Sequence, residues 1–470
     1  MKVCLILEGC YPYVRGGVST WAHQYMTASS HIDFVLWTIH ATPQDAREML
    51  YDLPANVVEH HQVFLNGVMP GKAHLSRATC IAAVDAMRRI LQQQQDGWDA
   101  LIDALQGSGD GIDFLTRSAA FLDLARELSE QHPGLGMADA FYGLRSMFLP
   151  IARVLSSAVP QADLYHSAVA GYGGLLASLA AHQTGKPMIL TEHGLYPRER
   201  EEELLSADWT KPCMRALWTQ LFYDMSRCAY AHATRVTALF DEARQRQISI
   251  GCSADKCVVI PNGIDHQAFS EIPPCVPSEV FHIGAFVRFA AIKDLKTMIH
   301  AFAVLHSRTP QTVLHLMGGT DDEDYKAACV ALIHRLHLED SVLVEGHVDT
   351  RLAMRRMDVT LLSSISEGQP LALLEAMASA RACVATRVGN CVELIEREVD
   401  DIGAAGICCT PMMPQELADA LDTLRKDEAL RRRMGDNGRL RVAARYRRET
   451  MLKGYHDLYK EVDGCGRHRV

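Results

Sequence analysis

The sequence lacks the motifs that would assign it to several common classes of enzyme. Its 14 cysteines include no C-x-x-C pair and its 21 histidines include no H-E-x-x-H cluster, so spacing alone identifies no zinc site. There is also no G-x-G-x-x-G fingerprint, no G-x-x-x-x-G-K-[ST] loop and no G-x-S-x-G elbow. We therefore expect neither a nicotinamide enzyme, nor a P-loop nucleotidase, nor an α/β-hydrolase.

A long hydrophobic run is missing as well. The most apolar stretch, residues 168–181, is interrupted by three glycines and falls short of the roughly 20 residues needed to span a bilayer. The N-terminus has a short apolar run without a cleavage site, so we interpret residues 3–7 as a buried strand rather than a signal peptide. Scattered thiols and the absent export signal predict a protein of a reducing compartment, the cytoplasm.

The sequence has fewer basic than acidic residues. Lys and Arg total 47 against 57 Asp and Glu, a formal net charge of −10. A general nucleic-acid binder needs a basic surface that releases phosphate counterions, so we expect no nucleic-acid partner. Binding of one small anion is still compatible with this balance, because it needs only two or three local cations.

What the sequence does have is a regular alternation of strand-like and helix-like segments. Strands are predicted at residues 3–7, 32–38, 57–64, 163–167, 187–192, 233–236, 256–260, 279–283, 312–317, 342–345, 359–362 and 383–386. Helices are predicted at residues 17–28, 173–184, 209–231, 295–307, 324–336 and 370–380, and charged helices over 414–462. This alternation is typical of an α/β protein with parallel sheets covered on both faces.

Two segments interrupt the alternation. Residues 74–156 have apolar side chains at i, i+3 and i+4, which predicts a helical insertion with a turn at the GSGDG sequence, 107–111. The proline-rich segment 271–278 is predicted to be an interdomain linker.

We therefore predict two doubly wound, Rossmann-like domains that face a ligand-binding cleft at the carboxyl ends of their strands. The N-terminal domain covers residues 1–272 and the C-terminal domain covers residues 279–440. Helices over residues 441–470 are expected to pack back toward the first domain.

Candidate site residues of the first domain follow predicted strands. Gly16 and Gly17 begin a helix after the first strand, where backbone N–H groups can approach an anion closely. His193, in T-E-H-G, ends the strand over 187–192 and would face the cleft. A simple turn and a structural histidine would explain these residues equally well. The P-N-G-I-D sequence at 261–265 is likewise explained as a turn.

The second domain supplies charged candidates. Arg288 and Lys293 flank a loop between a strand and a helix, and such a pair of cations suits a diphosphate. In S-E-G-Q-P-L-A-L-L-E, Pro370 fits the first helical turn, so Glu367 lies in the loop and Glu375 on the helix. Taken singly, each of these residues could also be an exposed surface side chain.

An acidic run over residues 321–324 contains a D-x-D pattern, Asp322 and Asp324. In a different transferase fold such a pattern holds a divalent metal. Here it precedes a predicted helix, where acidic side chains are favoured by the positive end of the helix dipole. We interpret it as a helix start and expect no metal there.

Taken in order, the motifs G-G-V, T-E-H-G, P-N-G-I-D, R-x4-K and E-x7-E resemble those of the retaining glycosyltransferases of family 4, which have the GT-B fold. The segments EGCYPYVRGGVSTW, LTEHGLYPREREEE and SEGQPLALLEAMA are most similar to the subgroup that acts in Pel exopolysaccharide synthesis. The helical insertion also agrees with that subgroup. The resemblance extends over nearly the whole chain.

The resemblance implies a role for each donor-binding residue. Gly16 and Gly17 are expected to approach the diphosphate of the donor. Arg288 and Lys293 are expected to bind that diphosphate and to stabilise the departing nucleotide. Glu375 is expected to hold the ribose hydroxyls.

For the sugar itself, the resemblance implies contacts from Glu367 and His193. With one carboxylate assigned to the ribose, no clear covalent nucleophile is left, and the family is described by same-face attack assisted by the leaving phosphate. No metal or other cofactor is expected, because the Arg and Lys side chains do the work of a divalent ion.

The implied function is transfer of a hexose or N-acetylhexosamine from a UDP-sugar to a growing exopolysaccharide acceptor. The implied partner is a membrane-embedded polysaccharide synthase complex of the Pel type, which would place the cytoplasmic protein peripherally at the inner membrane through partner proteins. The loop FAAI, residues 289–292, departs from this subgroup, whose members tend to carry a proline there. A catalytically weak nucleotide-sugar-binding subunit, or another GT-B enzyme such as a sugar-nucleotide epimerase, is therefore the alternative.

Overall fold

The computed structural model describes residues 1–43, 48–66, 75–94, 96–206, 210–275, 278–320, 322–396 and 402–466. The chain divides into two compact units. The first contains residues 1–259 and 455–470, and the second contains residues 260–454. The described residues include no helix that is long and apolar enough to cross a membrane.

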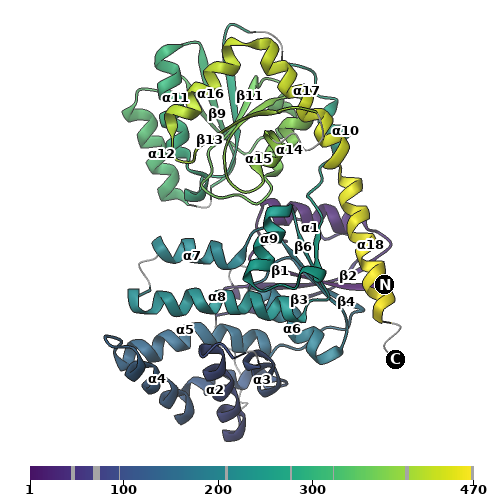
Figure 1. The fold of residues 1–470 in the computed structure, drawn as a ribbon, viewed down its shortest axis with the longest axis vertical. Helices are drawn as coiled ribbons and strands as arrows, with labels where there is room; N and C mark the ends of the chain where they lie inside the picture. Colours follow the sequence, from purple (N-terminus) through teal and green to yellow (C-terminus); the bar gives the residue numbers. More distant parts are fainter. Residues whose placement is uncertain are drawn as a thin grey trace. The chain divides into compact units, whose positions relative to one another are not determined.

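A seven-stranded parallel sheet forms the centre of the first unit (Figure 1). Its strands are β1 (Lys2–Glu8), β2 (Asp33–His40), β3 (Val57–Phe64), β4 (Leu164–Ser167), β5 (Met188–Glu192), β6 (Arg235–Ala238) and β7 (Cys257–Val259). Their order across the sheet is β3-β2-β1-β4-β5-β6-β7. Strands β1 and β2 are almost wholly buried apolar residues, as expected for a parallel sheet covered on both faces.

Helices cover both faces of this sheet. They are α1 (Gly17–Ala28), α6 (Tyr172–Thr184), α8 (Pro212–His232) and α9 (Asp241–Ile250), with the short 3-10 helix η3 (Ala254–Lys256) before β7, while α7 (Tyr196–Ser206) packs against α8. The insertion contains α2 (Arg77–Leu91), α3 (Gly97–Leu105), η2 (Gly109–Arg117), α4 (Ala119–Gln131) and α5 (Met137–Leu155). It packs against α6 and α8 and shares one hydrophobic core with the sheet (Figure 1).

The second unit repeats the design with six parallel strands in the order β10-β9-β8-β11-β12-β13. The strands are β8 (Phe281–Phe286), β9 (Thr312–Met317), β10 (Val342–Gly346), β11 (Val359–Leu362), β12 (Ala382–Thr386) and β13 (Gly406–Cys409). Its helices are α10 (His266–Ser270), η4 (Ala291–Lys293), α11 (Leu295–Arg308), α12 (Glu323–Arg335), α13 (Thr350–Met354), α14 (Leu371–Ala378), α15 (Cys391–Ile395), α16 (Pro414–Lys426) and α17 (Glu428–Arg445). The fold is therefore the predicted pair of Rossmann-like α/β units.

The last helix, α18 (Arg448–Gly466), begins in the second unit and ends in the first. In the first unit its Tyr455 and Tyr459 are fully buried. The hydroxyl of Tyr459 lies 2.6 Å from Nδ1 of His166 on β4, and Nε2 of that histidine lies 2.8 Å from Oγ1 of Thr191 on β5. Burial lowers the pKa of His166 to about 3, so this histidine is neutral and the network carries no charge.

Most predicted elements are present with ends that differ by a few residues. Helices α7, α9, α10, α13 and α15 and strand β13 were not predicted, because these segments are short or strongly polar and show little periodicity. The turn predicted at 107–111 is only partly a turn, since Gly109 already begins the helix η2. Pro370 caps α14 instead of occupying its first turn.

The boundary between the units lies at residues 259 and 260, ahead of the proline-rich segment. Residues 260–272 belong to the second unit, because Ile264 pairs with Arg447 and the side chains of Phe269 and Ile272 join the second core. Residues 276–277 of the predicted linker, the predicted helix start at 209, the insertion start at 74 and Asp321 of the acidic run lie outside the described residues.

Candidate active site

The charged candidates of the second unit lie at the point where its strand order reverses. The chain runs from β8 outward to β9 and β10, then returns to the other side of β8 and continues through β11, β12 and β13. The loop after β8 carries Arg288 and Lys293, and the loop after β11 carries Glu367. Loops that follow neighbouring parallel strands at such a reversal meet at the carboxyl edge of the sheet, which is where open α/β sheets bind ligands.

Lys293 and Glu367 are in direct contact at this edge. Nζ of Lys293 donates to Oε1 of Glu367 at 2.6 Å, and their side chains are only 19% and 9% exposed. The hydroxyl of Ser364 donates to the same carboxylate oxygen at 2.5 Å. A shielded ion pair with an additional hydrogen bond has a fixed geometry, so the ammonium group is held in place before any ligand arrives.

Backbone contacts hold the two loops together. The hydroxyl of Ser363 donates to the carbonyl oxygens of Lys293 and Asp294 at 2.9 and 3.0 Å, and the amide of Ile365 donates to the carbonyl of Ile292 at 2.9 Å. Asp294 adopts a left-handed conformation with φ 45° and caps α11 by accepting from the amide of Thr297. The backbone at Lys293 is therefore held by the loop after β11 and by the cap of α11.

Gly389, in the loop after β12, packs closely against the loop that carries Glu367. Its φ is +52°, and a Cβ there would lie 1.9 Å from the carbonyl oxygen of Glu367. The amide of Asn390 donates to the carbonyl of Gly368 at 2.9 Å. Only glycine fits this close approach of two backbones, so the position of Glu367 depends on it.

Arg288 lies half-buried in the first residues after β8. Its neighbours Val287 and Phe289 extend the strand pairing, since their amides donate to the carbonyls of Met317 and Gly319 at 2.9 and 2.8 Å. The backbone that carries the guanidinium group is therefore fixed by the sheet.

Glu375 occupies a different environment, in the middle of α14. The helix buries its neighbours Leu374 and Ala376, and among the described residues the carboxylate has no hydrogen-bond or ion-pair partner. Burial without a partner raises the pKa of Glu375 to about 7. A carboxylate in this state gains from a ligand that donates hydrogen bonds to it, such as a pair of hydroxyl groups.

In the first unit, Gly16 and Gly17 form the start of α1, where Gly16 has extended backbone and precedes the first helical residue. A Cβ at either glycine would meet no atom within 4 Å among the described residues. The packing of the unit therefore does not require glycine at these two positions. The space beside the helix start is open to an approaching ligand, as a phosphate-binding helix terminus requires.

His193 follows β5 and packs against α1. Its ring meets the ring of Trp21 edge-on at a centroid distance of 4.6 Å. Its buried Nε2 has no hydrogen-bond partner among the described residues, and burial lowers its pKa to about 4. The imidazole is therefore neutral near pH 7 and has an unused polar atom, which suits hydrogen bonding to an uncharged group.

The structure brings some predicted residues together and gives others structural roles. Lys293 contacts Glu367, whereas the P-N-G-I-D turn is used in the fold: the amide of Asn262 donates to Oε1 of Gln369 at 2.6 Å, and Asp265 caps α10. Asp322 caps α12 by accepting from the amide of Tyr325 at 2.9 Å, as its predicted role at a helix start requires.

Ser364 and Glu8 lie at the carboxyl edges of the two sheets and were not among the predicted residues. Ser364 holds Glu367, and Glu8 at the end of β1 accepts from the amide of Gly173 at the start of α6. Burial raises the pKa of Glu8. The available signal was a polar residue immediately after an apolar strand, which places a side chain at the carboxyl edge of a parallel sheet.

Comparison with known proteins identifies the two units. Residues 1–255 match the family model described as a domain of unknown function, DUF3492, and residues 278–441 match the model described as Glycosyl transferases group 1. The N-acetyl-alpha-D-glucosaminyl L-malate synthase of Bacillus anthracis is 33% identical over 175 residues, which are 37% of this chain and 44% of that protein. The chain thus spans less than half of that relative's length.

Two further proteins match over most of the chain. The D-inositol 3-phosphate glycosyltransferase of Arthrobacter sp. (strain FB24) is 29% identical over 372 residues, 72% of this chain and 82% of that protein. The crystal structure of HepE of Anabaena in complex with UDP-glucose has a TM-score of 0.61 at 16% identity and covers 98% of this chain and 100% of that chain. With the first model covering more than half of its length, the chain belongs to the DUF3492 family, its second unit contains a group 1 glycosyltransferase domain with the GT-B type of fold, and the relative that covers most of it is a glycosyltransferase.

Proposed function

We propose that the protein is a retaining glycosyltransferase that moves a hexose or N-acetylhexosamine from a UDP-sugar to a growing exopolysaccharide. The observation that carries this proposal is the preformed contact between Lys293 and Glu367, on the same sheet edge as Arg288. A structural neighbour supports the donor class, since HepE of Anabaena was crystallised with UDP-glucose.

Arg288 and Lys293 make the largest contribution to lowering the activation barrier of the transfer. Cleavage of the sugar–phosphate bond leaves negative charge on the departing diphosphate. Cations that are already fixed where this charge develops stabilise the transition state without reorganisation. Glu367 is a positioning residue for Lys293 through the 2.6 Å contact, and it has a second assigned role at the donor sugar. We propose that these side chains allow transfer without a divalent metal.

Glu367 and Glu375 have other roles in this proposal than the two carboxylates that flank the anomeric carbon in a retaining glycosidase. Glu367 is held by Lys293 and Ser364. Glu375 is assigned to the ribose hydroxyls of the nucleotide, which would be the donors that its unpartnered carboxylate lacks. With neither carboxylate free to attack the anomeric carbon, we propose same-face attack assisted by the leaving phosphate rather than a glycosyl–enzyme intermediate.

On the first unit, Gly16 and Gly17 are assigned to the donor diphosphate and His193 to the donor sugar. The open space at the glycines and the neutral, unpartnered imidazole support these roles. The relation to PelF, the glycosyltransferase of Pel exopolysaccharide synthesis, is supported by the sequence motifs. We extend the proposal to a polysaccharide acceptor and a membrane-embedded synthase complex of the Pel type on that basis.

The test is release of nucleotide from a panel of UDP-sugars in the presence of EDTA. Wild type is compared with Lys293→Ala and Glu375→Ala, and with Lys326→Ala, which removes an exposed lysine of α12, as the control. The proposal expects activity in wild type and the control and a large loss in the other two. Equal activity in all four proteins would overturn the site assignment.

Product analysis separates the proposal from its alternatives. Incorporation of sugar into polysaccharide supports a transferase. A new UDP-sugar formed without acceptor identifies an epimerase. Donor binding by calorimetry with no turnover on any acceptor identifies a nucleotide-sugar-binding subunit that acts only inside a complex.

A further inference from the structure

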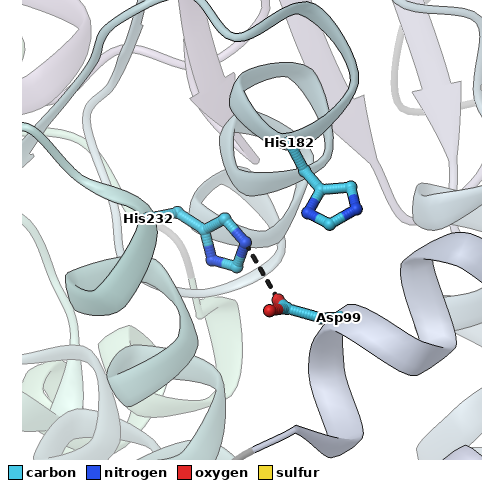
Figure 2. A group of neighbouring side chains, drawn as sticks. All are labelled: Asp99, His182 and His232. Atoms are coloured by element: carbon cyan, nitrogen blue, oxygen red, sulfur yellow. Dashed lines mark ion pairs between the residues drawn. The ribbon is translucent and has the colours of Figure 1, made fainter.

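We propose that Asp99, His182 and His232 bind one divalent transition-metal ion, with Zn²⁺ as the physiological choice, and that this ion fastens the helical insertion to the sheet of the first unit. The three residues come from three helices and point toward one another (Figure 2). They are far apart in the sequence, so no spacing motif reveals them.

Each residue reaches the cluster from a defined place. Asp99 lies in the first turn of α3, which belongs to the insertion, while His182 and His232 lie in the last turns of α6 and α8. One ligand atom from each side chain lies within 4.8 Å of the other two. Oδ1 of Asp99 and Nε2 of His232 are already 3.1 Å apart. Ligands of a tetrahedral zinc ion are about 3.4 Å apart when each bond is about 2.1 Å, so small rotations complete the site.

The hydrogen bonds around the cluster prepare the imidazoles to act as ligands. Nδ1 of His232 is 3.0 Å from the carbonyl oxygen of Cys228, one turn earlier on α8. A proton on Nδ1 that is donated to this carbonyl leaves the lone pair of Nε2 facing Asp99. Nε2 of His182 contacts Oδ1 of Asp103 at 2.8 Å. Bonds of this kind to a carbonyl and a carboxylate orient metal-binding histidines and raise their basicity.

The electrostatic setting favours a cation. Two imidazole rings lie with centroids 5.9 Å apart at the C-termini of two helices, where the helix dipoles are negative. Without a metal the arrangement is two His–Asp pairs whose carboxylates are largely exposed, and such pairs contribute little to stability. Two nitrogen ligands and one carboxylate suit Zn²⁺, Co²⁺ or Ni²⁺ rather than Mg²⁺ or Ca²⁺, which prefer oxygen ligands. Asp99 is largely exposed, so water completes the coordination.

The position of the cluster in the fold indicates a role in stability rather than in catalysis. Helix α6 ends before β5 begins, and α8 ends before β6 begins. The cluster therefore lies at the amino edge of the first sheet, whereas Gly16 and His193 follow strands at the carboxyl edge. A metal here would join α3 of the insertion to two core helices without touching the transfer chemistry. The proposal is thus independent of the proposed function.

The experiment measures metal binding to the untagged, EDTA-treated full chain by calorimetry and thermal unfolding. We expect one Zn²⁺ per chain, a rise of the unfolding temperature with Zn²⁺, and no comparable rise with Mg²⁺. Asp99→Asn and His182→Gln should each weaken Zn²⁺ binding by at least about tenfold. His334→Gln, which alters an exposed histidine paired with Glu339 in the second unit, should bind as wild type does.

Two readouts distinguish this site from metal binding elsewhere in the chain. Co²⁺ bound in place of Zn²⁺ should show no thiolate charge-transfer band, which excludes the cysteines as ligands. Amide exchange across α3 should slow when Zn²⁺ is added, because the ion ties this helix to α6 and α8. Absence of a bound ion, a thiolate band, or undiminished binding by folded Asp99→Asn and His182→Gln proteins would each overturn the proposal.

Discussion

The two parallel sheets of this protein are built alike and differ at their carboxyl edges. The edge of the second sheet presents charge that is already arranged, with Lys293 bound to Glu367 and Arg288 on the same loop. The residues predicted on the corresponding edge of the first sheet are His193, which is neutral, and Gly16 and Gly17, which leave open space. In the proposed function, the second unit contacts the donor diphosphate with fixed cations, and the first unit contacts the donor with backbone amides and a neutral imidazole.

The strongest way to break this comparison is to remove a cation. Lys293→Ala should lower kcat by about 10²–10³-fold, because it deletes a fixed positive charge at the leaving group. Steady-state nucleotide release at saturating donor measures the effect. Lys326→Ala should leave kcat unchanged, since that lysine is an exposed partner of Glu323 on α12. A similar kcat for both variants would show that charge on the second sheet is not catalytic.

A smaller loss of activity is expected when the neutral His193 of the first unit is changed. His193→Gln should lower kcat/KM for the donor by about tenfold, which corresponds to one uncharged hydrogen bond. Because the pKa of His193 is about 4, this residue stays neutral from about pH 5.5 to 8 and contributes no pH dependence there. His61→Gln, an exposed change on β3, is the matched control. A pH profile that changes shape in His193→Gln would contradict the neutral assignment.

The proposed role of Glu375 predicts that the affinity for the nucleotide depends on pH. Its pKa of about 7 lies above the usual carboxyl value, so below pH 7 it is mainly protonated and cannot accept from two ribose hydroxyls. Ligand donors favour the ionised form, so donor binding releases a proton and affinity rises with pH. The Kd for UDP should be about tenfold larger at pH 6 than at pH 8 in wild type.

The control for this effect is Glu375→Gln, which should bind UDP with a Kd that changes little over the same range. Glu323→Gln alters an exposed carboxylate of the same unit and should keep the wild-type dependence. The reverse sign, with affinity falling as pH rises, would exclude Glu375 as an acceptor of ligand hydroxyls.

The smallest effect is expected in the neutral network of the first unit. Tyr459→Phe removes the buried hydroxyl that lies 2.6 Å from His166, and should lower the free energy of unfolding by about 1 kcal/mol. Denaturant titration measures this loss, and kcat should change less than about twofold. Tyr142→Phe, on an exposed ring, is the control. An equal effect in the two variants would mean that the network adds no stability.

The fold was predictable because parallel strands that are buried on both faces are continuous apolar runs, as in β1 and β9. The candidate site was predictable only as a set of residues. Nothing in the sequence indicated that Lys293 contacts Glu367, because that contact depends on the order of strands in the sheet. Ser364 and the cluster around Asp99 were missed for the same reason. The domain boundary was misplaced because prolines in 271–278 signal an irregular segment without showing which core it joins.

Helix α18 has a consequence for how the molecule is made. The first unit needs Tyr455 and Tyr459, which are fully buried beside Trp21, Tyr25 and His166. A ribosome synthesises these tyrosines about two hundred residues after residue 259, where the rest of that unit ends. The aromatic surface that they cover therefore lacks its cover until the second unit has been translated. Synthesis order makes the second unit the first that can be complete.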